Sequence, residues 1–72
     1  MSPAAIATEM QASTVNDLRW ECGPVVVHAD GSASFDVLAG TTYEHRGRKS
    51  TPVRVVPHTV TINADGSQTV SR

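Results

Sequence analysis

The sequence predicts a mostly β protein: a small five-stranded antiparallel meander that forms an open barrel or a two-layer sandwich, with a short N-terminal helix or arm. Apolar and polar residues alternate from Gly23 onward, and turn residues separate the alternating runs. A similar motif with a central Asp-Gly also occurs twice, over residues 25–32 and 60–67. We therefore divide the chain into an arm or short helix over residues 1–20 and a β-hairpin domain over residues 21–72.

The N-terminal segment is rich in alanine and contains one helix signal. Ser2 followed by Pro3 is typical of an N-cap and the first helical position. Ile6 and Met10 then lie four residues apart on one face, which predicts a helix over residues 3–12. Because isolated helices shorter than ~12–15 residues are marginal in water, an arm that becomes ordered only on a partner is the alternative.

The repeated Asp-Gly motifs predict two hairpins, and hydrophobic matching selects their register. A two-residue turn in the second motif would place Val70 opposite Thr61, on the wrong face for Val60. A three-residue loop with a left-handed glycine places Val60 opposite Val70, so we expect positive φ at Gly31 and Gly66.

The same loop in the first motif sets Val25 against Phe35 and Val27 against Ala33.

A third hairpin is expected between these two, with a bulge centred on Gly47, which should also have positive φ. This register pairs Glu44 with Arg48, Tyr43 with Lys49, Ala39 with Val53, and Val37 with Val55. One face then collects the apolar side chains of Val25, Val27, Phe35, Val37, Val53 and Val55. Pro57 cannot donate to a ladder, so it predicts a bend before a last hairpin over residues 58–71.

Length and composition limit the classes of protein that the chain fits. A chain of 72 residues has room for one domain and a thin core, whose ten valines supply much of the volume. No apolar run reaches 18 residues and no basic, apolar leader is present, so we expect neither a membrane span nor a signal peptide. Cys22 has no second cysteine to pair with, which favours a reducing compartment.

Arg outnumbers Lys, and Ala, Val, Thr and Gly are plentiful, which is the composition that GC-rich codons produce. Such a composition is typical of a GC-rich bacterium or its phage. We therefore expect a cytoplasmic protein or part of a virion.

The most distinctive polar stretch is the predicted tip of the third hairpin. Four residues, His45, Arg46, Arg48 and Lys49, gather potential positive charge there, and Arg54 could extend it along the strand. A basic ribbon can contact phosphates, and arginine also binds carboxylates of an acidic protein. A solvated tip without any partner is the third possibility. The net charge of −1 supplies little long-range attraction for nucleic acid.

Three apolar residues of the N-terminal segment, Ile6, Met10 and Trp20, have no obvious place in so small a core. We therefore expect them to contact a protein partner or another copy of the chain.

Residues capable of catalysis or metal binding are present without the spacing that such sites need. His28, His45, His58 and Cys22 show neither a CxxC nor an HxxxH pattern. No glycine-rich phosphate loop leads from a strand into a helix, and the Asp-Gly motifs lack the carboxylate spacing of a calcium loop. We therefore expect no catalytic residue, no cofactor, no metal and no small-molecule substrate.

These observations favour a non-enzymatic binding or assembly module that docks on a larger protein or on copies of itself, as small phage structural proteins and small inhibitory proteins do. The alternative is a small nucleic-acid-binding β-barrel that uses the basic hairpin tip.

Overall fold

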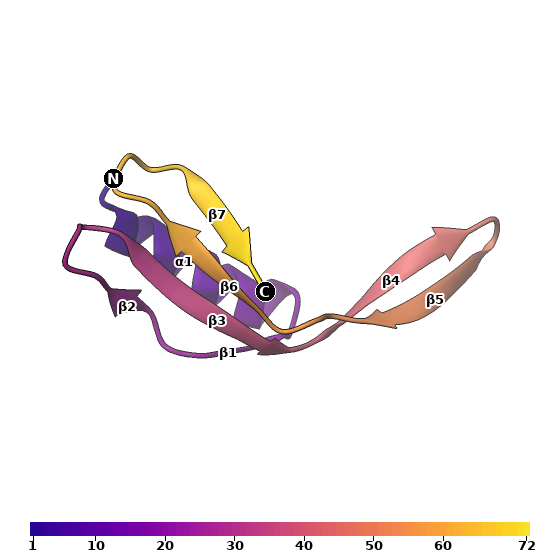
Figure 1. Cartoon of the computed structure of the whole chain (residues 1–72). Coiled ribbons are helices and arrows are strands. Elements are labelled where there is room, and N and C mark those ends of the chain that lie inside the picture. Colours follow the sequence, from indigo (N-terminus) through magenta and orange to yellow (C-terminus); the bar gives the residue numbers. More distant parts are fainter.

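A computed structural model describes all residues of the chain, Met1–Arg72, as a helix packed on an antiparallel sheet from which a two-stranded ribbon projects (Figure 1). The molecule is elongated, with principal extents of 46 × 21 × 19 Å. The elements in chain order are α1 (Pro3–Asp17), β1 (Glu21–Cys22), β2 (Val26–Val27), β3 (Ala33–Ala39), β4 (Thr41–Arg46), β5 (Lys49–Arg54), β6 (His58–Ile62) and β7 (Gln68–Ser71).

Helix α1 begins at Pro3, as predicted, but ends at Asp17, five residues beyond the predicted end at residue 12. The side chain of Ser2 accepts a hydrogen bond from the N–H of Ala5 at 3.2 Å, and Pro3 occupies the first turn. The helix continues to Asp17 because it lies along the sheet, and this packing stabilises turns that would fray in isolation. Arg19 then reverses the chain in the left-handed region, with φ of 57°. With 15 residues of mixed polarity, α1 is neither long nor apolar enough to cross a membrane.

The main sheet contains β1, β2, β3, β6 and β7, and every neighbouring pair is antiparallel. β1 and β2 follow one another along the same edge of β3, separated by residues 23–25, and β7 forms the opposite edge. The first and last hairpins have the predicted register: Val27 lies opposite Ala33, and Val60 lies opposite Val70. Their loops turn at glycines in the left-handed region, Gly31 with φ of 90° and Gly66 with φ of 91°.

The predicted register of the third hairpin is wrong. Arg46 lies opposite Lys49, so the turn contains two residues, Gly47 and Arg48, and only Gly47 has positive φ, at 64°. All four predicted pairs are replaced: Glu44 faces Thr51, Tyr43 faces Pro52, Thr42 faces Val53, and Val37 faces His58.

The predicted register fails because the chain offers β3 two alternating apolar runs, Val53 with Val55 and Val60 with Ile62, and hydrophobic matching does not distinguish them. The sheet instead places Phe35 opposite Val60, where α1 covers both side chains.

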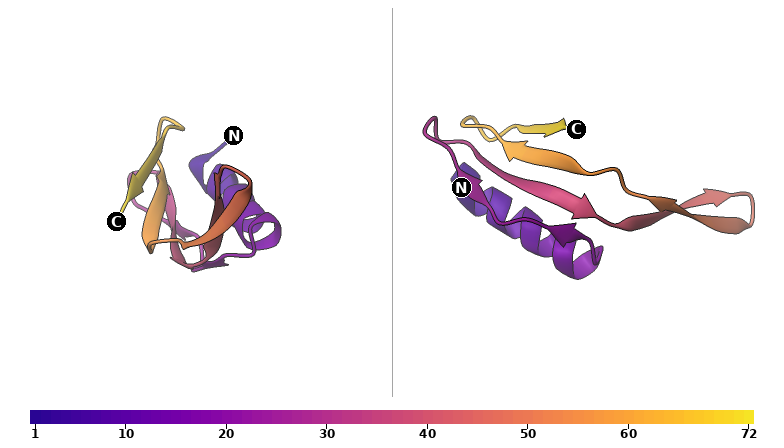
Figure 2. Two further views of the ribbon diagram at one scale, coloured as in Figure 1. Left: turned by 90° about the vertical axis from the view of Figure 1, so that its right-hand side faces the viewer. Right: turned by 60° about the horizontal axis from the view of Figure 1, so that its bottom comes forward.

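Helix α1 lies against one face of the sheet (Figure 2), and the core is formed between them. It consists of Ala7, Ala33, Phe35, Val37, Val60 and Ile62. The second layer is therefore a helix, and the sheet closes neither into a barrel nor onto a second sheet. Of the valines predicted for the core, Val37 is buried, and Val25 and Val55 pack at the margin of the core. Val53 is half-buried on the ribbon, and Val27 is 62% exposed.

Pro57 lies in the bend between β5 and β6, as predicted.

Candidate functional site

The β4–β5 ribbon extends the central hairpin of the sheet beyond the part that α1 covers (Figure 2). Its register continues that of β3 and β6: Val37 faces His58, and four residues further along, Thr41 faces Arg54. The N–H of Val55 donates to the carbonyl oxygen of Gly40 at 3.0 Å and bridges the two parts. Every ribbon residue except Val53 is exposed. Two strands without a packed face are marginally stable on their own, so the ribbon depends on its base or on a partner.

Trp20 fixes the base of the ribbon. Its indole Nε1–H donates to the carbonyl oxygen of Thr41 at 3.1 Å. The ring lies so close to Gly40 that a β-carbon there would be 2.5 Å from Trp20 Cγ. Only glycine allows this approach, so the ring packs directly on the backbone where the sheet becomes the ribbon.

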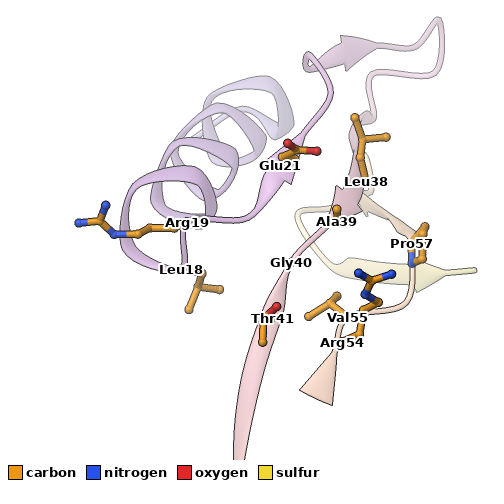
Figure 3. A pocket seen from close by; sticks show the side chains of 10 residues that line it. All are labelled: Leu18, Arg19, Glu21, Leu38, Ala39, Gly40, Thr41, Arg54, Val55 and Pro57. Atoms are coloured by element: carbon orange, nitrogen blue, oxygen red, sulfur yellow. The ribbon is translucent and has the colours of Figure 1, made fainter. Parts of the chain in front are cut away.

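An open groove of about 570 Å³ lies beside this contact (Figure 3). One wall comes from the end of α1 and from β1, and the other comes from the ends of β3 and β5 with the bend that follows. Leu18 and Leu38 are each 52% exposed in this groove. Arg54 adds a positive charge to the wall that β3 and β5 form. No local sequence pattern indicates this groove, because its walls come together only in the folded chain.

The ribbon's side chains are divided between two faces, because directly paired residues share a face. Glu44, Arg46 and Lys49 lie on one face, where Arg46 forms an ion pair with Glu44 at 3.7 Å. Tyr43 and His45 lie on the other, and His45 Nδ1 is 3.0 Å from Ser50 Oγ.

Arg54 pairs with Thr41 and shares the Tyr43 face, so it does not extend the positive strip of Arg46 and Lys49.

Charge is segregated between the ribbon and the rest of the molecule. Residues 41–54 contain four cations, Arg46, Arg48, Lys49 and Arg54, and one carboxylate, Glu44, which gives a formal charge of +3. Because the whole chain carries −1, the remaining residues carry −4. This contrast is invisible in the net charge and makes the ribbon the one strongly basic part of the molecule.

The residues capable of metal binding or catalysis do not converge. The histidines outside the ribbon have structural contacts: His28 Nε2 lies 2.7 Å from Ser34 Oγ, and His58 Nδ1 lies 2.8 Å from the carbonyl oxygen of Val56. No group of three or more His, Cys, Asp or Glu residues is arranged to hold a metal ion. Burial raises the pKa of the Cys22 thiol, which disfavours the reactive thiolate.

The Asp-Gly motifs form turns closed by aspartate. Asp30 Oδ1 accepts hydrogen bonds from the hydroxyl and backbone N–H of Ser32, and Asp65 does the same with Ser67. These hydrogen bonds lower the pKa of both aspartates.

The structure gives Ile6, Met10 and Trp20 places inside the molecule. All three are half-buried against the core, which contradicts the premise that the core has no room for them. The reason for assigning them to a partner therefore no longer holds.

Comparison of the chain with protein-family models, with curated proteins and with solved structures found no match.

Proposed function

We propose that the protein is a non-enzymatic binding module that uses the β4–β5 ribbon to dock on an acidic surface of a larger protein or of further copies of itself. The observation that carries the proposal is the ribbon itself. A chain of 72 residues places two six-residue strands and a charge of +3 outside its own core. Such an arm contributes little to the stability of the monomer but presents a large accessible surface.

The distribution of charge favours a protein partner over nucleic acid. Arg46 and Lys49 face each other on one side of the ribbon, whereas Tyr43 lies on the opposite side. Proteins that bind single strands combine a basic groove with aromatic side chains on which bases stack. Arginine on a β-ribbon is equally suited to bidentate contacts with carboxylates.

Within this class, small phage structural proteins and small inhibitory proteins act by such docking, in a virion or in the cytoplasm.

The experiment compares the wild-type chain with the variant Arg46→Ser/Arg48→Ser/Lys49→Ser, purified from the source under native conditions with nuclease treatment. We expect wild type to retain a protein partner or to form oligomers, as measured by native mass spectrometry, and the variant to lose both. Substitution by serine of half-buried Thr61 and exposed Thr69, which pair on the face of the sheet that α1 does not cover, is the control outside the ribbon and should change nothing. Binding that nuclease abolishes would instead support nucleic acid, and a variant that binds as well as wild type would refute the proposal.

A further inference from the structure

The two outer edges of the ribbon differ in their capacity to accept another strand. In an antiparallel pair, residues alternate between those whose backbone groups bond across the ladder and those whose groups point outward. The pair that closes a two-residue turn, Arg46 with Lys49, bonds across the ladder. Gly40 precedes Arg46 by six residues, an even number, and its carbonyl oxygen accepts a hydrogen bond across the ladder from the N–H of Val55. The even-numbered residues of the segment 40–46 therefore bond across the ladder.

The backbone groups that point outward therefore belong to Thr41, Tyr43 and His45 on β4, and to Ser50, Pro52 and Arg54 on β5. The hydrogen bond from Trp20 Nε1 to the Thr41 carbonyl oxygen confirms this direction, because Trp20 approaches from outside the ribbon.

Pro52 closes the β5 edge. It occupies the central outward position, where a proline costs the ribbon no ladder bond but leaves an added strand without a donor. β4 contains no proline, and no strand pairs with its outer side. Since Trp20 Nε1 already donates to the outward carbonyl oxygen of Thr41, the available segment of this edge is centred on Tyr43 and His45.

The charge beside this edge selects the partner. Arg46 and Lys49 lie directly opposite each other, and like charges in that relation destabilise a sheet. Glu44 is the only carboxylate on the ribbon, and its Oε2 is 3.7 Å from Arg46 Nη2. Side chains of an added strand alternate between the same two faces, so a carboxylate on that strand would lie beside Arg46 and offset the repulsion.

We propose that the β4 edge at Tyr43 and His45 binds an extended, acidic segment of a protein partner by strand addition. This inference rests on the proposed function and specifies the mode of docking: backbone hydrogen bonds supply the attachment, and carboxylates beside the basic tip supply the selectivity.

The test is an NMR titration of the full-length ¹⁵N-labelled chain with an alternating Thr-Glu nonapeptide, with the matching Thr-Lys nonapeptide as the control. The amide signals of Tyr43 and His45 should shift and gain protection from hydrogen exchange, while those of Ser50 and Arg54 should not. The Thr-Lys peptide should produce neither effect. An equal response to both peptides, or no response to the Thr-Glu peptide, would overturn the proposal.

Two proline variants separate the edges. His45→Pro and Ser50→Pro each remove one outward N–H, and each removes the same His45–Ser50 side-chain contact, so they differ only in the edge affected. We expect His45→Pro to weaken binding of the Thr-Glu peptide at least tenfold and Ser50→Pro to weaken it less than twofold. If either variant unfolds the ribbon, the hydrogen-exchange pattern of the wild-type complex decides the edge.

Other outcomes identify which proposal fails. If both proline variants bind equally well but the triple serine variant does not, the ribbon binds through its charges alone, which refutes strand addition and leaves the proposed function intact. If the Tyr43 and His45 signals shift on concentrating the protein without peptide, a second copy occupies the edge and the acidic segment is the wrong partner.

Discussion

Replacing Gly40 by alanine should destabilise the protein through one contact, that between Trp20 and the base of the ribbon. The new β-carbon would lie 2.5 Å from both Cγ and Cδ1 of the indole ring, so the ring must move. Overpacking of this kind costs about 1–3 kcal/mol. Displacing the ring also breaks the hydrogen bond to the Thr41 carbonyl oxygen, at about 0.5–1.5 kcal/mol.

One term opposes these costs. Alanine restricts the unfolded chain more than glycine does, which stabilises the folded state by about 0.4–1 kcal/mol where φ is compatible, and Gly40 lies outside the left-handed region. The net expectation for Gly40→Ala is a loss of about 2 kcal/mol, or a decrease in Tm of roughly 8–16 °C for a domain of this size.

Gly23→Ala is the matched control. Its β-carbon would meet only Asp36 atoms at 3.8 and 3.9 Å, which are ordinary contacts, so this change should be neutral or should stabilise the protein by up to about 1 kcal/mol.

A double-mutant cycle with Trp20→Ala tests the cause. If the ring is the obstacle, Gly40→Ala should cost little in a chain that already lacks the ring, and the two changes should be strongly non-additive. Urea unfolding followed by far-UV circular dichroism measures all four proteins without relying on tryptophan fluorescence, with a stabilising osmolyte added for the weakest. An equal cost of Gly40→Ala with and without Trp20 would refute the reasoning.

Three further predictions concern the turns and the end of the helix. Alanine at Gly31 or Gly66 should each reduce the free energy of unfolding by ~1 kcal/mol, because both have positive φ; unchanged urea midpoints would contradict the assigned turns. Arg19→Gly should instead raise it by ~1 kcal/mol, because Arg19 occupies the left-handed region with φ of 57°; a loss in the same assay would show that its side chain stabilises the groove. The lowered pKa values of Asp30 and Asp65 stabilise the folded state above their unfolded pKa of about 3.9, and this contribution disappears as pH falls through the folded values. The stability difference between wild type and Asp30→Asn/Asp65→Asn should therefore shrink below about pH 4 in acid titrations followed by circular dichroism; a constant difference would rule out this linkage.

The sequence by itself determined the local features of this protein. The Ser2–Pro3 start of the helix depends on capping by the adjacent residues. The register of the first and last hairpins depends on an Asp-Gly turn and on the apolar residues immediately beside it, such as Val60 and Val70. The basic composition of the ribbon tip could also be read directly from the chain. In each case, the physical determinants lie within a few residues of one another.

The tertiary structure alone decided which strands pair and which faces are buried. Two alternating apolar runs, Val53 with Val55 and Val60 with Ile62, could each pair with β3, and the position of α1 on the sheet selects the second. The same packing gives Ile6 and Met10 a place against the core, extends the helix to Asp17, and leaves the ribbon uncovered. Trp20 lies on Gly40 although they are distant in sequence, so no local pattern could reveal the contact that fixes the base of the ribbon. Hydrophobic alternation in the sequence indicates that a strand has a buried face, whereas only the folded chain determines what covers that face.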